Sequence, residues 1–190
     1  MNKKFTIMTA GFLALLGSAA LADDHHGGTE AAIARGRAEV SLQEVIDKVA
    51  ADSKGRVVEI HFEEMDAFFS FGDGPLVYEV EALTPEGVME YKVDPKDGNI
   101  ISRSKELMGG LEYRKLPDDM KLTLKQAVEK AEKTGGGEVV SAKLKKEDGT
   151  VLYHIRVNEA GTGRTLLIDP LNGNVYPVSS HHSDEEGHES

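Results

Sequence analysis

An eight-residue pattern occurs twice in this chain. It reads Val-Asp-Pro-Lys-Asp-Gly-Asn-Ile at residues 93–100 and Ile-Asp-Pro-Leu-Asn-Gly-Asn-Val at residues 168–175. Proline presets φ, Asp or Asn followed by Gly supplies positions that tolerate positive φ, and the leading Asp can bond to the backbone two residues on. The recurrence of such a turn between strand-like flanks indicates an internally duplicated chain.

Each copy of the turn is preceded by the signature of an amphipathic helix. Ser41 with Glu44, and Thr123 with Gln126, have the spacing of capping boxes. Each helix is expected to end at the glycines that follow it, near Gly55 in the first copy. Apolar residues recur at helical spacing in both copies: Leu42, Val45, Ile46 and Val49 in the first, and Leu124, Ala127, Val128 and Ala131 in the second.

After each helix the hydrophobic period changes to two, as in residues 58–62. This alternation predicts strands with one buried face and one wet face, so His61 and His154 are expected to face outward as ordinary surface histidines. Short connections such as residues 146–149 favour an antiparallel meander. The sequence therefore predicts an α+β fold of two tandem repeats, each one helix packed on a three- to four-stranded antiparallel sheet.

The spacing of these features sets the boundaries of the repeats. The helix caps lie 82 residues apart and the turns 75 residues apart, so the first repeat carries seven extra residues, at about 65–74. We expect the first repeat to span residues 40–103 and the second to span residues 122–178. Residues 104–121 would then form a linker between them.

The two ends of the chain differ from the repeats. Residues 1–22 combine two early lysines, an apolar run and a small-x-small cleavage site, which is typical of a secretory signal peptide. Residues 23–39 are expected to form a flexible segment, and residues 179–190 a disordered tail rich in histidine and acids. Cleavage of the signal predicts a periplasmic or secreted protein with no membrane insertion afterwards.

Composition narrows the classes of function. The chain has no Cys, which excludes disulfides and thiolate-bound zinc or iron–sulfur clusters. Its formal net charge of −11 argues against nucleic acid or an anionic membrane surface as a partner. The sequence contains no His-Glu-x-x-His, no Gly-x-Ser-x-Gly and no Gly-rich phosphate loop. Asp94 and Asp169 are explained by their turns, so the expected protein is not an enzyme.

These features together resemble the PepSY family. The resemblance rests on the amphipathic helices, on residues 78–80 and 153–155 (Tyr-Glu-Val and Tyr-His-Ile), and on the Val-Asp-Pro-x-x-Gly-x-Ile/Val close of each repeat. It implies small exported α+β modules that occur in propeptides of thermolysin-like metallopeptidases and have a proposed role as peptidase inhibitors. It supplies no catalytic residues. It points to an exported, non-enzymatic binding or regulatory module that modulates a peptidase or another envelope protein.

One candidate for partner binding is the insertion in the first repeat. Phe68, Phe69 and Phe71 are three of the four phenylalanines that follow the signal segment. Aromatic residues on a loop can anchor a partner protein. The alternative is that their rings fold over the core or the second repeat. A sheet edge or a concave sheet face would be a further docking surface for an exported or envelope protein.

An alternative function is copper or divalent-metal binding in the periplasm by terminal histidines. Cleavage after Ala22 would expose Asp23, Asp24 and His25, whose amine, backbone amides and imidazole can form the square-planar nitrogen set that Cu(II) and Ni(II) prefer. The tail adds further histidines among acids: His181, His182 and His188. The alternative is that both ends are solvated acidic segments. No other cofactor is expected.

Overall fold

The computed structural model describes residues 38–64, 75–106, 113, 116–117, 119–147, 149–159 and 162–178. In chain order the elements are α2 (Leu42–Ser53), β1 (Arg56–Glu64), β2 (Leu76–Thr84), β3 (Gly87–Val93), β4 (Ile100–Lys105), α3 (Leu124–Gly135), β5 (Glu138–Glu147), β6 (Thr150–Glu159), β7 (Thr162–Ile168) and β8 (Val175–Pro177). Each repeat is therefore one helix followed by four strands. The predicted α+β class and the predicted duplication are confirmed.

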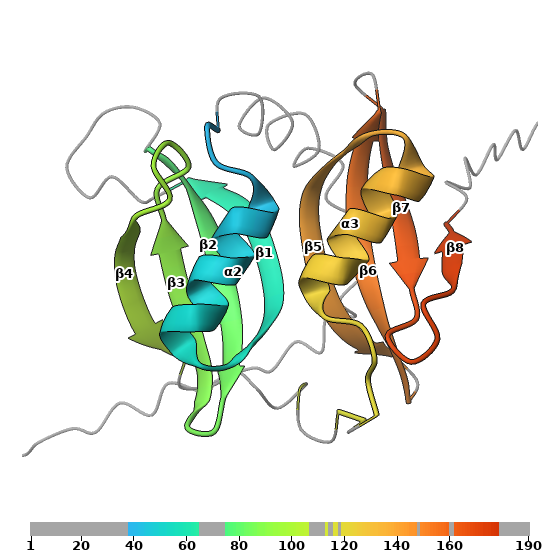
Figure 1. Cartoon of the computed structure of the whole chain (residues 1–190), viewed down its shortest axis with the longest axis horizontal. Coiled ribbons are helices and arrows are strands. Elements are labelled where there is room, and N and C mark those ends of the chain that lie inside the picture. Colours follow the sequence, from blue (N-terminus) through green and yellow to red (C-terminus); the bar gives the residue numbers. More distant parts are fainter. Residues whose placement is uncertain are drawn as a thin grey trace, which may run out of the picture.

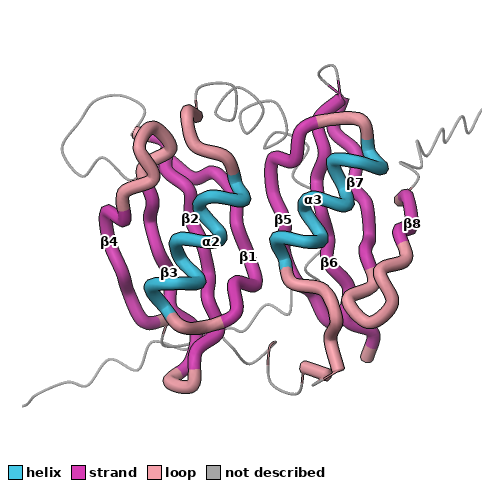
Figure 2. Tube along the Cα trace, viewed as in Figure 1, coloured by secondary structure: helices cyan, strands magenta, loops and turns pink. Residues whose placement is uncertain are grey.

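The two repeats share one sheet. Its strand order is β4-β3-β2-β1-β5-β6-β7-β8, and every neighbouring pair is antiparallel. The order of the second repeat mirrors that of the first about the β1–β5 junction. Both helices lie on the same face of this sheet, α2 over the first repeat and α3 over the second (Figures 1 and 2). The other face carries no described helix.

The β1–β5 junction has approximate two-fold symmetry. Ile60 of β1 pairs with Ala142 of β5, and these two residues are 82 positions apart, as the two helix caps are. Equivalent residues thus oppose each other across the junction, which places a local two-fold axis between them. Both side chains are buried beneath the helices. The duplication therefore sets the packing of the halves as well as their internal folds.

The helix ends follow the sequence closely, with one difference. Both capping boxes form, Ser41 with Glu44 and Thr123 with Gln126. In the second repeat the residue after the helix is Gly136, whose φ of 68° is the left-handed conformation that glycine adopts without a steric penalty. In the first repeat the equivalent residue is Lys54, with φ of 53°. The helix there ends at Ser53, and Lys54 takes the left-handed position in place of a glycine.

That glycine serves a different purpose. A Cβ built on Gly55 would lie 2.5 Å from the carbonyl oxygen of Leu83 on β2. At the equivalent Gly137, a Cβ would lie 2.4 Å from the carbonyl oxygen of Asn158 on β6. Both distances are too short for any side chain. Each glycine lets the chain pass close to the neighbouring strand as it enters the sheet.

The repeated Asp-Pro turns hold the entrance of each helix. Asp94 Oδ1 accepts a hydrogen bond from the amide of Lys96, as the Asx turn predicted from the sequence requires, and the second turn repeats this bond. The carbonyl oxygen of Pro95 then accepts from the amides of Glu39 and Val40, just before the cap of α2. In the second repeat the corresponding acceptor is the carbonyl of the equivalent proline. Each turn thus holds in place the segment of chain that leads into its helix.

A buried tyrosine completes the same arrangement in each repeat. Tyr78 Oη donates to the carbonyl oxygen of Val40 at 3.1 Å, and Tyr153 Oη donates to that of Leu122 at 2.9 Å. Both rings are fully buried between helix and sheet. Burial raises the pKa of Tyr153 to about 12, so the phenol remains a neutral donor. Turn and tyrosine together fix where each helix begins.

Candidate interaction surface on the sheet

The helix-free face of the sheet carries charges of opposite sign on its two halves. Alternating strand residues are buried under the helices, and the residues between them form this face. Its ionised groups in the first repeat are mainly acidic: Glu59, Glu63, Glu79, Glu81 and Glu90, with Lys92. Those in the second repeat are mainly basic: Lys143, Lys145 and Arg156, with Glu138 opposite Asn158 at the start of β5.

Two carboxyl groups of the acidic half lie close to each other and to one lysine. Glu63 and Glu79 are hydrogen-bonded across β1 and β2, and Lys92 Nζ lies 2.8 Å from Glu63 Oε2 and 3.5 Å from Glu79 Oε2. Burial, the hydrogen bond and the charge of Glu63 raise the pKa of Glu79 to about 7. The same hydrogen bond lowers the pKa of Glu63. Of the two carboxyl groups, Glu79 is therefore the one that holds a proton below about pH 7.

His61 lies on the helix-free face, where the alternation places it, and is held there by carboxylates. Its Nδ1 is 3.3 Å from Glu59 Oε1 and its Nε2 is 3.8 Å from Glu79 Oε1. The neighbouring Glu59 carboxylate raises the pKa of His61 against the opposing effect of burial. Burial alone would raise the pKa of Glu59, but the adjacent His61 and Lys143 hold it below its ordinary value. These groups form one charged network.

Lys143 carries this network across the junction. Its Nζ lies 2.6 Å from Glu59 Oε2, and Glu59 and Lys143 are directly paired across β1 and β5. The Glu59 side chain is only 12% exposed. An ion pair that is partly withdrawn from water interacts more strongly than an exposed one. The pair therefore links the two repeats through side chains at the point where their backbones meet.

A shallow depression of about 460 Å³ lies over the junction on this face. Its lining comes from strands of both repeats: Glu59, Ile60, His61, Ser141, Ala142, Lys143, Lys145, His154, Arg156 and Thr165. Lys145 and Arg156 make no ion pair or hydrogen bond within the part of the chain that the structure describes. Arg156 stands opposite Ser141 and Thr165 on the neighbouring strands, whereas Lys145 lies four residues further along β5. Each of these unpaired cations is suited to binding a carboxylate or another oxyanion.

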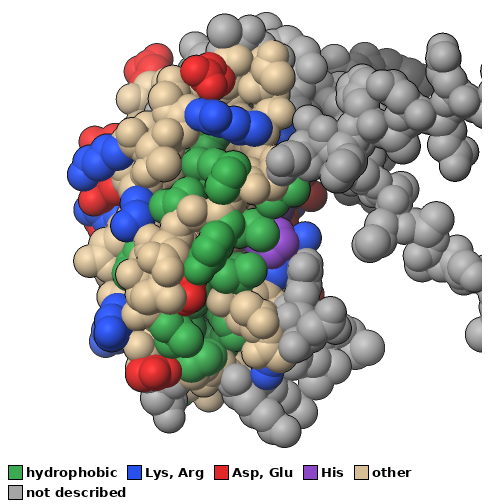
Figure 3. Space-filling model, turned by 90° about the vertical axis from the view of Figure 1, so that its right-hand side faces the viewer, with side chains coloured by type: hydrophobic (Ala, Val, Ile, Leu, Met, Phe, Trp, Pro, Cys, Tyr) green, Lys and Arg blue, Asp and Glu red, His purple; other side chains and the backbone are tan. Residues whose placement is uncertain are grey.

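The β8 end of the sheet is more apolar than the charged helix-free face. β8 has three residues, and beyond it Val178 still donates its amide to the carbonyl oxygen of Thr165 on β7. Tyr176 and Val178 are each 45% exposed. Figure 3 faces this side of the molecule and shows hydrophobic side chains gathered in a strip along it. The second repeat therefore ends in an apolar rim next to its basic face.

The site residues predicted from the sequence lie outside the described ranges. This holds for the metal candidates Asp23, Asp24, His25, His181, His182 and His188, and for the partner-binding candidates Phe68, Phe69 and Phe71. Copper binding stays a prediction, and titrating Cu(II) while following the visible ligand-field band, with His25→Ala as control, tests it. Among the residues placed by the structure, no group of three or more His, Cys, Asp or Glu is arranged to hold a metal ion.

The depression was missed because it exists only when β1 pairs with β5. Part of its signal is nevertheless present in the sequence. Alternate residues of the second repeat's first strand are Ser141, Lys143 and Lys145, whereas the matching residues of the first repeat are acidic or histidine. Comparing the polar faces of the two copies would have revealed that the sign of the charge changes between them.

None of the described helices is long and apolar enough to cross a membrane.

Two helix-on-sheet units in tandem, joined edge to edge, define a class of duplicated α+β modules. The family described as PepSY, "Peptidase propeptide and YPEB domain", matches residues 39–103 and 121–175. These segments make up more than half of the chain. The chain therefore belongs to the PepSY family.

Two solved structures are similar to this chain. One is a candidate lipoprotein from Clostridium difficile 630, with 23% sequence identity, a TM-score of 0.43, and coverage of 73% of this chain and 91% of the other. The second is the YpeB C-terminal domain of Bacillus megaterium, with 16% identity, a TM-score of 0.31, and coverage of 75% and 67% respectively. No curated protein matches the chain.

Proposed function

We propose that this protein is a non-enzymatic binding module that takes up an extended segment of another exported or envelope protein on the helix-free face of its sheet. The observation that carries this proposal is the depression over the β1–β5 junction, with Glu59 and His61 on one side and Lys145 and Arg156 on the other. A segment crossing it would meet charges of both signs in a fixed order. Such an arrangement selects a partner and its orientation.

The fold limits which sheet edges and faces a partner protein can reach. The β1 and β5 edges pair with each other, so neither is available for strand addition. The outer edges are β4 and the short β8. The helix-free face, in contrast, brings residues of both repeats into one depression. Because strands of both repeats line this depression, the proposed binding surface requires the duplicated chain.

The family description supports a peptidase as the first partner to test, because it names the propeptides of peptidases. Export is supported by the signal-like composition of residues 1–22. A propeptide-like module acts by contact with a folded enzyme and needs no reacting groups of its own. The charged depression supplies the contact surface that such a mode of action requires.

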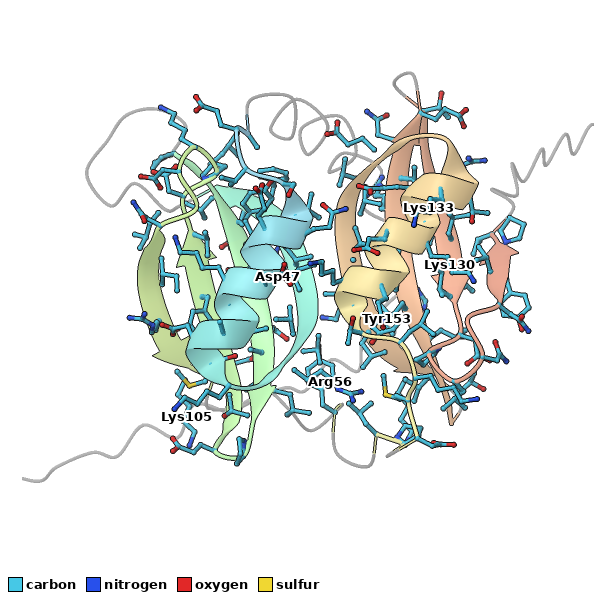
Figure 4. All side chains as sticks on the ribbon, viewed as in Figure 1. Asp47, Arg56, Lys105, Lys130, Lys133 and Tyr153 are labelled. Carbon is cyan, nitrogen blue, oxygen red and sulfur yellow. The ribbon has the colours of Figure 1, made fainter. Side chains whose placement is uncertain are left out.

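The test is stoichiometric inhibition of a thermolysin-like metallopeptidase by the purified protein. We expect inhibition that weakens at least tenfold in the Lys145→Glu, Arg156→Glu variant, because the basic side of the depression is reversed. The matched control is Lys105→Glu with Lys133→Glu, which makes the same change of charge at residues away from the helix-free face (Figure 4). Equal inhibition by both variants would remove the depression as the binding surface.

A further inference from the structure

The chain leaves the described part of the fold beside the basic half of the depression. The last described residue, Val178, is bonded through its amide to Thr165 of β7, and Thr165 lines the depression. Thr165 pairs with Arg156 of β6, and Arg156 pairs with Ser141 of β5. These residues form one row across the sheet, perpendicular to the strands. The row runs from the C-terminal end of β8 to the junction.

The following residues are long enough to reach along this row. Neighbouring strands lie about 4.8 Å apart, so Arg156 is roughly 10 Å from the backbone of Val178. Asp184 lies six positions beyond Val178, and an extended chain covers about 3.3 Å per residue. A reach of about 20 Å exceeds the distance to be covered. No rearrangement of the sheet is needed for contact.

The charge of this segment is complementary to the depression. Residues 183–190 contain four acids and no Lys or Arg: Asp184, Glu185, Glu186 and Glu189. On the face next to them, Lys145 and Arg156 have no partner among the described residues. The first repeat, beyond the junction, is acidic and would repel such a segment. The basic half is therefore the surface that attracts it.

We propose that the acidic segment of residues 183–190 occupies the basic half of the depression in the same molecule. The linkage makes the encounter intramolecular, at an effective concentration in the millimolar range, so weak charge pairs suffice. Being largely electrostatic, the contact is screened by salt. An external ligand of the same face would have to displace this segment. The proposal needs no second protein and stands independently of the function proposed above.

Paramagnetic NMR tests the proposal on the full chain. The chain has no Cys, so Ser190→Cys accepts a single nitroxide label. At low salt we expect loss of amide signal intensity at Ser141, Lys145, Arg156 and Thr165, and recovery of that signal at high salt. Neutralising the segment with Asp184→Asn, Glu185→Gln, Glu186→Gln and Glu189→Gln should also restore the intensity.

Matched variants and mixing decide the outcome. Lys145→Glu with Arg156→Glu should abolish the signal loss, whereas Lys105→Glu with Lys133→Glu should leave it intact. A loss that is unaffected by the first pair, or that is concentrated on α2 and α3, would overturn the proposal. Mixing isotope-labelled chains with spin-labelled, isotope-free chains distinguishes a second copy as the occupant. Signal loss of the same size in that mixture would also overturn it.

Discussion

At the scale of single residues, Lys54 stands out because it holds a left-handed backbone conformation at the end of α2. Its counterpart in the second repeat, Gly136, adopts the same conformation without a Cβ. Lys54 is exposed and so has no core contact to lose on substitution. The first repeat thus retains a local conformational cost that the second repeat avoids.

We therefore predict that Lys54→Gly raises the free energy of unfolding by about 1 kcal/mol. The reciprocal change, Gly136→Ala, should lower it by about the same amount because it introduces a Cβ at positive φ. Urea unfolding followed by circular dichroism measures both. Loss of stability in Lys54→Gly would show that the lysine side chain makes a compensating contribution.

Glu79 and His61 make stability depend on pH in the same direction. The folded-state pKa of Glu79, about 7, is higher than the ordinary value of 4.5, so the native state binds this proton more tightly than the unfolded chain does. Its contribution is complete below pH 4.5 and is lost as the pH rises through about 7. The raised pKa of His61 likewise gives stabilisation that is lost as the pH rises through its folded value.

We expect Glu79→Gln to raise the melting temperature at pH 8.5 and to change it much less at pH 5.5. Glutamine resembles the protonated glutamate that the native state holds at the lower pH, and it removes the buried charge at the higher pH. Thermal unfolding by circular dichroism at the two pH values is the measurement. Glu86→Gln, the same change at an exposed turn, is the control. An equal shift at both pH values would contradict the expectation.

At the scale of elements, each helix is held just before its N-cap by a tyrosine from the strand beneath it. Tyr153→Phe removes the hydrogen bond to the carbonyl of Leu122 and leaves that partly buried acceptor without its donor. We predict a loss of about 1–2 kcal/mol in unfolding free energy. Tyr176→Phe, which removes a hydroxyl from an exposed ring, should cost less than about 0.5 kcal/mol. Chemical denaturation of both variants tests the difference; equal costs would contradict the role assigned to Tyr153.

Local signals made these elements predictable. The capping boxes, the Asx bond of Asp94 and the alternation along β6 each depend on a few neighbouring residues, so the sequence predicts them directly. The sequence placed the end of α2 near Gly55; the left-handed residue there is Lys54, and Gly55 instead allows close approach to Leu83. The left-handed conformation of Lys54 could not be predicted, because lysine has no preference for positive φ.

The joining of the two sheets was not predictable in the same way. The β1–β5 pairing uses main-chain groups, which every strand offers, and the sequence does not state which edges meet. The depression depends on this pairing, because its cations and carboxylates come from opposite repeats. Sequence reasoning therefore placed His61 and His154 on an outward face and did not bring the charged residues of the two repeats together.

At the scale of the whole molecule, the junction should couple the stability of the repeats. We predict that Lys143→Met lowers the free energy of unfolding by about 1–3 kcal/mol, because it leaves the largely buried Glu59 carboxylate without its main cation. Glu59→Gln in the Lys143→Met background should restore part of that loss. A double-mutant cycle by urea unfolding measures the coupling. Strictly additive effects would show that the pair does not tie the repeats together.

The local two-fold axis at Ile60 and Ala142 bears on how the two copies can diverge. Residues on such an axis face their own counterparts, so perfect symmetry would set two identical side chains against each other. Here a large side chain meets a small one, and the shared space under the helices is filled by their combined volume. Two alanines would leave a void and two isoleucines would crowd it. Each half has thus become specific for the other, although both arose from the same sequence.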